Sequence, residues 1–277
     1  MSESTQPPAA APVHDAAQPD LAPEVLHEVK DGTLRLTLNR PDKRNPLSPS
    51  VIGALLEGVA RAKADPAVRV VVITGAGKVF SAGGDLSAMG KPGTSGGQGI
   101  AGSLPDLFMA MAHLGKPVVA MVNGHALAGG CGLVAACDMA IAADDAQLGT
   151  PEINVGLWPM MIMATIFRSV GRKKGIELIT TGERISATEA ERIGLINRAV
   201  PRDRLEEETA ALCSKLAAKS PKVMELGLAG YHAVFDGALE PDLAELQRRF
   251  LEVLGTEDAR EGLMAFLEKR APAWKGR

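Results

Sequence analysis

Two short glycine-rich segments are the parts of the sequence best suited to chemistry. The first reads Ala82-Gly83-Gly84-Asp85 and the second reads Ala128-Gly129-Gly130, and each follows an apolar, β-branched run and a turn. Glycine lets a ligand approach the backbone closely, and N–H groups at a helix N-terminus are unpaired and partially positive. Two such donors aimed at one point would stabilise negative charge on a carbonyl oxygen. Either segment taken singly is also compatible with a tight, closely packed turn.

One carboxylate, Glu152 in the segment GTPEINVGL, is the candidate acid or base. A carboxyl group whose pKa is moved towards neutrality by burial can take a proton from one carbon and return it to another. Taken alone, Glu152 is also compatible with a solvated loop residue. Asp144 and Asp145 are more consistent with turn residues, and His125 with a hydrogen-bonded structural role.

The size, composition and charge of the chain limit the kinds of protein it can be and the partners it can bind. Of its 277 residues 46% are apolar and only 3% aromatic, which suits one large domain, or a domain with an appendage, around an aliphatic core. The net charge is −3 and basic residues are not concentrated, so no nucleic acid partner is expected. No apolar run reaches membrane-spanning length and the cysteines form no zinc-binding pattern, so neither a membrane nor a metal is expected. Reduced, buried cysteines are typical of a cytoplasmic protein.

Strand and helix patterns alternate up to about Arg172. Two strands are expected within 25–41 around the turn Asp31-Gly32, and further buried strands over 68–75, 116–124 and 138–144. A helix is expected after Ser48, which is a suitable N-cap followed by proline. This alternation predicts an α/β fold with mainly parallel strands.

Beyond Arg172 the pattern is mostly helical, with a capping box at Ser186 and Glu189. Three helices are expected over 205–219, 242–254 and 257–270, with the basic residues Lys269 and Arg270 in the last turn of the third. The sequence thus predicts a disordered tail over 1–21, an α/β body over 22–200 and a helical region over 201–277. The G-x-G-x-x-G within 90–102 is not preceded by a strand, so it is interpreted as a mobile loop and not as a dinucleotide site.

Several segments, in order, resemble the crotonase superfamily, the enoyl-CoA hydratase/isomerase family. These are FSAGGDL, VNGHALAGGCGLVAACDMAIAADDAQLGTPEINVGL, TGERISATEAERIGLINRAVP and EDAREGLMAFLEKR. The resemblance implies a spiral of repeated ββα units with a helical C-terminal region. It also implies an acyl-CoA substrate, no separate cofactor, and assembly as a homotrimer or a dimer of trimers through the C-terminal helices.

The resemblance assigns roles to individual residues. The amides of Gly84 and Gly129 would hold the thioester oxygen of the acyl-CoA, and Glu152 would move the proton. The CoA nucleotide would lie near a loop and the C-terminal helix, through Arg40, Lys43, Arg44, Phe266 and Lys269. The other expected pocket residues are Ala82, Asp85, His125, Gly130, Gly132, Trp158 and Met160.

The chain departs from the family pattern at Gly132. Relatives that hydrate enoyl-CoA usually carry a first glutamate there, in addition to the one that matches Glu152. Because adding water needs both an activating group and a proton donor, a lone carboxylate favours shifting a double bond from the 3,4 to the 2,3 position. Hydration by Glu152 alone or with a substitute, thioester hydrolysis, decarboxylation, and acyl-CoA binding without turnover remain open alternatives.

Overall fold

The computed structural model describes residues 22–84 and 103–275, and within them the fold is a mixed α/β body with a helical C-terminal region. The expected tail (1–21), Asp85 and the glycine-rich segment 90–102 lie outside the described residues. The main sheet has the strand order β1-β2-β4-β7-β9-β12. Its strands are β1 (Val25–Lys30), β2 (Thr33–Leu38), β4 (Val70–Gly75), β7 (Val118–Val122), β9 (Met139–Ala143) and β12 (Arg198–Val200).

The expected strand pattern is confirmed. Strands β1 and β2 form an antiparallel hairpin whose turn residues Asp31 and Gly32 have positive φ (48° and 75°), as a two-residue hairpin turn requires. The pairs β2–β4, β4–β7, β7–β9 and β9–β12 are all parallel. Parallel neighbours need crossover connections, which the intervening helices supply.

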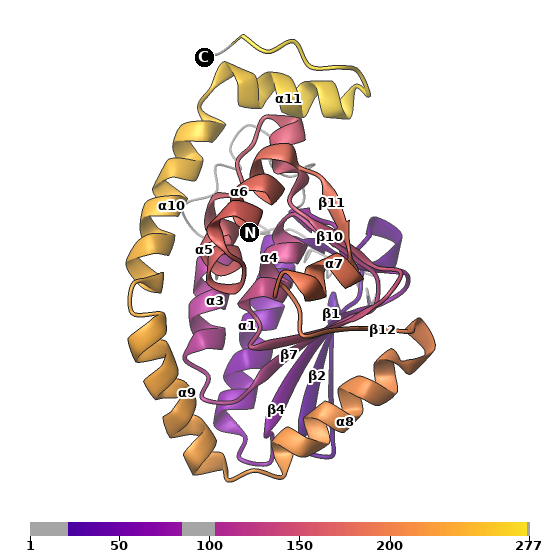
Figure 1. Cartoon of the computed structure of the whole chain (residues 1–277), viewed down its shortest axis with the longest axis vertical. Helices are drawn as coiled ribbons and strands as arrows, with labels where there is room; N and C mark the ends of the chain where they lie inside the picture. The colour runs from indigo at the N-terminus through magenta and orange to yellow at the C-terminus, as the bar shows by residue number, and fades with distance from the viewer. Residues whose placement is uncertain (1–21, 85–102, 276–277) are drawn as a thin grey trace, which may run out of the picture.

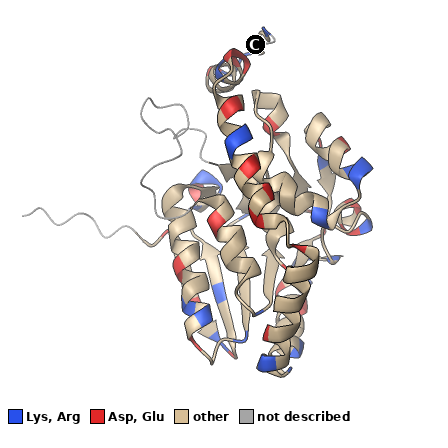
Figure 2. Ribbon diagram, turned by 90° about the vertical axis from the view of Figure 1, so that its left-hand side faces the viewer, with Lys and Arg blue, Asp and Glu red and all other residues tan. Residues whose placement is uncertain are grey.

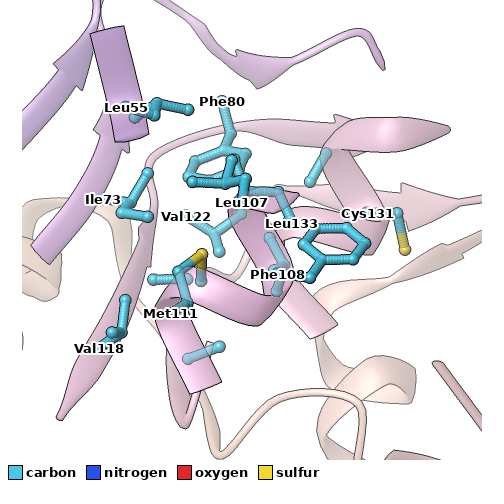
Figure 3. Close-up of a cluster of buried hydrophobic side chains, with 14 of the residues drawn as sticks. Leu55, Ile73, Phe80, Leu107, Phe108, Met111, Val118, Val122, Cys131 and Leu133 are labelled. Carbon is cyan, nitrogen blue, oxygen red and sulfur yellow. The ribbon is translucent and has the colours of Figure 1, made fainter. Parts of the chain in front are cut away.

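Both faces of the main sheet are covered, so its central strands are apolar throughout. On one face Val71, Ile73 and Val122 pack against helices of the α/β body, together with Phe80 and Phe108 (Figure 3). On the other face Val70, Val72, Val119, Met121, Ile141 and Ala143 pack against one helix of the C-terminal region. This division follows from the period-two alternation of a strand, and it explains why the strands are continuous hydrophobic runs.

The helices begin where the sequence supplies caps. Ser48 accepts a hydrogen bond from the Val51 amide at the start of the first helix, as expected, and Ser103 and Asp106 form a capping box that was not predicted. The helices of the body are α1 (Pro49–Ala64), α3 (Leu104–Ala112), α4 (Gly129–Ala136), α5 (Met160–Ser169), α6 (Arg172–Thr181) and α7 (Ala187–Arg192).

The C-terminal region is helical from residue 205 onward. Helix α8 covers one face of the main sheet, whereas α9 and α10 run as a long column beside α1, α3 and α5, and α11 lies at its end (Figure 1). Acidic and basic residues both occur on the outer helices of the molecule (Figure 2). The helices are α8 (Leu205–Ala217), α9 (Pro221–Phe235), α10 (Leu239–Leu254) and α11 (Glu257–Leu267). In the described part of the chain no helix has both the length and the apolar character needed to span a membrane.

Three details of the helical predictions are wrong. Helix α9 was missed, although Ser220 and Pro221 are a capping signal for it. Helix α11 ends at Leu267, so Lys269 and Arg270 lie beyond its last turn; Lys269 has a φ of 55° and Arg270 pairs with Glu261. At α7 only half of the capping box forms. Ser186 accepts from the Glu189 amide, while the Glu189 carboxylate accepts from Arg192.

Two smaller sheets position the glycine corners. The four-stranded sheet has the order β11-β10-β8-β5, and the third pairs the two-residue strands β3 and β6 in parallel. Strands β5 and β8 lead directly into the first and second glycine corner. The strands are β3 (Pro46–Leu47), β5 (Val79–Ser81), β6 (Gly83–Gly84), β8 (His125–Leu127), β10 (Gln147–Gly149) and β11 (Arg184–Ser186).

Candidate active site

The second glycine corner is a sharp turn from β8 into α4. Its pivot is Ala128, whose φ of 51° and ψ of −130° are unusual for a residue with a side chain. The Ala128 amide donates to the Gly149 carbonyl at 2.9 Å, which fixes the turn against β10. The first bond within the helix runs from the Gly132 amide to the Ala128 carbonyl, so the amides of residues 129–131 have no acceptor within the helix.

The first glycine corner is fixed by hydrogen bonds to the preceding loop. The Ala82 amide donates to the Arg44 carbonyl at 2.9 Å, and the Gly83 amide donates to Ser81 Oγ at 3.2 Å. Ser81 Oγ in turn donates to the Asn45 carbonyl at 2.8 Å. These contacts fix Ala82 and Gly83, and the parallel pairing of β6 with β3 positions Gly84 opposite Leu47.

The two corners meet. A Cβ built on Gly129 would stand 3.6 Å from the Gly84 amide nitrogen, and one on Gly83 would stand 3.0 Å from the Gly129 nitrogen. The amide nitrogens of Gly84 and Gly129 are therefore within about 6 Å of each other, given standard N–Cα and Cα–Cβ lengths. A single oxygen that accepts two N–H bonds of about 2.9 Å spans donors up to about 6 Å apart, so the spacing suits one shared acceptor.

Side chains are excluded at this junction. A Cβ on Gly83, whose φ is 93°, would lie 2.5 Å from the Ala128 Cβ, and one on Gly130 would lie 2.7 Å from the Ser81 carbonyl oxygen. Gly83 and Gly130 therefore permit close packing, which is the alternative that the sequence left open for a tight turn. The Cβ of a residue at Gly129, by contrast, meets nothing nearer than 3.5 Å.

Glu152 lies in the 3-10 turn η2 (Pro151–Val155), and one of its two carboxylate oxygens is buried. Among the described residues its Oε2 is inaccessible to solvent and has no hydrogen-bond partner. Burial raises the pKa of Glu152 to about 7, against a smaller opposing effect of its own backbone N–H. A buried carboxyl group that titrates near neutrality can both accept and donate a proton.

The first turn of α4 connects Glu152 to the glycine corners. Burial, and next the negative charge of Glu152, raise the pKa of the Cys131 thiol to about 12, so the two side chains lie close enough to interact electrostatically. Cys131 lies at the edge of the buried cluster, beside Phe108 (Figure 3). The turn that begins with the Gly129 amide therefore carries a side chain within electrostatic range of the Glu152 carboxylate.

Gly132, where the resemblance implied a missing carboxylate, faces a residue that the sequence reasoning did not single out. A Cβ on Gly132 would overlap the Cβ and Cγ2 of Ile162 in α5 and would lie 3.3 Å from its Cα. The side-chain direction at this position is thus already filled by hydrocarbon. The signal in the sequence was a glycine inside a helix, which indicates a close approach by another element.

Trp158 and Met160, which are expected to line the pocket, lie just before α5 and in its first turn. Trp158 and Met160 are half-buried there, and the Trp158 Nε1 donates to Met163 Sδ at 3.4 Å. His125 has a structural contact, because its Nδ1 accepts from the Gln147 amide at 3.1 Å and joins β8 to β10.

The basic loop lies next to the first glycine corner. It contains the 3-10 turn η1 (Pro41–Lys43) followed by Arg44, whose carbonyl anchors Ala82. The side chains of Lys43 and Arg44 are exposed, whereas the Arg40 guanidinium pairs with Glu24 at 3.0 Å. Of the three cations, Lys43 and Arg44 are therefore the ones available to an anion.

The C-terminal helix of the same chain packs against the turn that carries Glu152. A Cβ on Gly262 in α11 would overlap the Val155 carbonyl, and one on Gly156 would lie 2.7 Å from the Asp258 carbonyl. Phe266 is exposed near the end of this helix, and Lys269 follows it. Within residues 22–84 and 103–275, no cluster of His, Cys, Asp and Glu side chains has the arrangement of a metal site.

Comparison with known proteins identifies the family of the chain. The sequence pattern of the family described as enoyl-CoA hydratase/isomerase matches residues 28–277. The chain is 34% identical over 259 residues to 2,3-dehydroadipyl-CoA hydratase of Escherichia coli, which covers 92% of this chain and 99% of that protein. It is 35% identical over 246 residues to enoyl-CoA hydratase domain-containing protein 3, mitochondrial, of Rattus norvegicus, which covers 88% and 82%.

The fold agrees as well. It superposes on a crystal structure of carnitinyl-CoA hydratase from Mycobacterium avium with a TM-score of 0.82 at 37% identity, over 92% of this chain and 99% of that one. The elements thus define a protein of the crotonase fold. The chain belongs to the enoyl-CoA hydratase/isomerase family and is an acyl-CoA enzyme of that type, as the resemblance predicted.

Proposed function

We propose that the enzyme isomerises an enoyl-CoA thioester, moving its double bond from the 3,4 to the 2,3 position with Glu152 as the only acid–base group. The observation that carries the proposal is the pairing of one carboxylate, whose buried Oε2 has no hydrogen-bond partner among the described residues, with a side-chain position, 132, that is filled by Ile162. One carboxylate suffices for a proton shuttle on a single face of the substrate. Hydration is easier with two carboxylates, because one can activate the water while the other donates the proton to the α-carbon.

The thioester oxygen would accept hydrogen bonds from the amides of Gly84 and Gly129. Removing the proton at C2 leaves an enolate, whose negative charge gathers on that oxygen. Backbone donors fixed in place stabilise this charge without having to reorganise during the reaction. The spacing of the two amide nitrogens and the hydrogen bonds that fix both corners support this assignment.

Glu152 would take the proton from C2 and return it to C4. The electron pair of the C2–H bond moves to form the C2=C3 bond, the C3=C4 pair accepts the proton at C4, and no atom is gained or lost. A carboxyl group whose pKa is about 7 is half ionised near neutral pH, so it serves in both directions.

The CoA phosphates are proposed to meet Lys43 and Arg44, which are exposed beside the first glycine corner. Phe266, near the end of the helix that packs on the Glu152 turn, and Lys269, just beyond that helix, remain candidates for the CoA moiety. Homotrimers or dimers of trimers are proposed through the C-terminal helices. Helix α9 buries none of its residues within the chain, and Val223, Val234 and Phe235 on it are at least 69% exposed.

Hydration is the second candidate, because several similar proteins carry hydratase in their names. In that case Glu152 would position the water as well as move the proton. Incubating the purified protein separately with 2-enoyl-CoA and 3-enoyl-CoA, and following the products by mass, separates the two. Isomerisation gives a product of unchanged mass, and hydration gives a product heavier by one water; hydration as the faster reaction would refute the proposal.

A further inference from the structure

Helices α4 and α5 approach each other most closely where Gly132 faces Ile162. Ile162 is only 3% exposed, and its Cβ and Cγ2 take up the space of a side chain at 132. One turn of α5 further along, Thr165 Oγ1 donates to the Gly132 carbonyl at 3.3 Å and lies 2.9 Å from the Ile162 carbonyl. The isoleucine is therefore held against the glycine by packing and by a hydrogen bond between the helices.

This contact lies in the same helical turn as the proposed chemistry. Gly129 opens that turn, and Cys131, next to Gly132, interacts electrostatically with Glu152. A side chain at position 132 would leave the turn towards α5, where its Cβ collides with the Ile162 side chain. Neither a carboxylate nor a water molecule has room in that direction.

We propose that Ile162 determines which reaction the site performs, because it excludes both a second carboxylate and a water molecule from the space beside Gly132. This inference rests on the proposed isomerase function. Hydration of a 2-enoyl thioester requires a water whose oxygen lone pair forms the bond to C3 while the C2=C3 electron pair moves to give the enolate. One proton of that water goes to a base, and C2 is then protonated. With Ile162 in place, the enolate exchanges protons only with Glu152.

Removing the isoleucine side chain would leave a space with hydrogen-bonding groups at its edge. A buried water needs room and two to four polar partners. The Gly132 carbonyl and the Thr165 hydroxyl already lie at this spot. The structure thus gives position 162 a role in excluding water that an ordinary core residue does not have.

The first test combines substitutions at both positions. In Gly132→Glu the new side chain collides with Ile162, so we expect a lowered melting temperature and lost isomerisation. In the double variant Gly132→Glu/Ile162→Gly the collision is relieved. We expect this variant to hydrate 2-enoyl-CoA at least tenfold faster than the wild-type protein, with one ¹⁸O incorporated per product from H₂¹⁸O. Ile166→Gly is the matched control, because Ile166 is equally buried in α5, one turn further along, and should gain no hydration.

The second test needs no activity. Gly132→Ala should lower the melting temperature clearly in the wild-type background and much less in the Ile162→Gly background, since coupled positions are not additive. An equal drop in melting temperature in both backgrounds would contradict the contact between positions 132 and 162. A folded double variant that still fails to hydrate, or hydrates no faster than Ile166→Gly, would overturn the role in reaction choice.

The two failures are distinguishable. If the proposed function is wrong, the wild-type protein hydrates 2-enoyl-CoA faster than it isomerises 3-enoyl-CoA, or Glu152→Gln still isomerises at the normal rate. Both results are obtained without any change at position 162. If only the present inference is wrong, these wild-type results stand and the variants at 132 and 162 gain no hydration.

Discussion

The buried carboxylate of Glu152 should lower the free energy of unfolding above neutral pH, and Glu152→Gln should remove this destabilisation. Burial raises the pKa of Glu152 from 4.5 to about 7. Below about pH 4.5 the carboxyl group is protonated in both the folded and the unfolded chain, and its full contribution to stability is present. Between pH 4.5 and 7 the unfolded chain ionises first, so that contribution is lost as the pH rises, and above about pH 7 the loss is complete.

The size of the effect follows from the shift. One pKa unit corresponds to 1.36 kcal/mol, so the ionised carboxylate destabilises the folded state by about 3 kcal/mol at pH 8. Because glutamine is neutral at every pH, we expect Glu152→Gln to be more stable than the wild-type protein by up to this amount at pH 8. The difference should vanish near pH 4.5.

Urea unfolding at a fixed protein concentration, from pH 4.5 to 8, measures this difference. Glu183→Gln is the control, because Glu183 is exposed and the same chemical change there should leave the free energy of unfolding nearly unchanged at all pH values. An unfolding free energy of Glu152→Gln equal to or below that of the wild-type protein at pH 8 would refute the burial argument. Turnover of an enoyl-CoA should fall by about 10²–10⁴-fold in the same variant, as expected when a general base is lost.

Three further predictions follow from the same contacts. The kcat/KM of the wild-type protein should rise about tenfold per pH unit below about pH 7 and level off above it, because the base must be ionised; a flat profile from pH 5.5 to 8 speaks against Glu152. Ala128→Gly should raise the unfolding free energy in urea by about 1 kcal/mol, since Ala128 is held at a φ of 51°, and a loss would contradict the strain. Asn45→Ala should lower the free energy of unfolding by about 3 kcal/mol. The Asn45 Nδ2 donates to the Ala76 and Val79 carbonyls and its Oδ1 accepts from the Arg40 amide, so a loss below about 1 kcal/mol would contradict the role of these hydrogen bonds.

Features fixed by local chemistry were predictable from the sequence. The turn at Asp31 and Gly32, the cap at Ser48 and the buried strands depend on residues a few positions apart, and the structure has them where they were expected. The close approach of the two glycine corners was expected only because the segments resemble a family. Nothing in the spacing of Gly84 and Gly129 requires them to meet.

Features that depend on distant partners were not predictable. The contact between Gly132 and Ile162 joins two helices, and Gly132 alone revealed only that some element comes close. The predicted end of α11 was three residues too late. The prediction placed Arg270 in the last turn because basic residues are favourable there, but Arg270 instead forms an ion pair with Glu261. The Asn45 hydrogen bonds to Ala76 and Val79 were likewise invisible, because they join separate loops.

A crystal structure of Glu152→Gln with bound 3-enoyl-CoA tests the central claim most directly. The account predicts a thioester oxygen at 2.7–3.2 Å from the amide nitrogens of both Gly84 and Gly129, with the carboxamide of residue 152 beside C2 and C4. Ile162 should remain against Gly132, with no water between them. A thioester oxygen bound elsewhere, or a residue 152 side chain turned away from these carbons, would contradict the account.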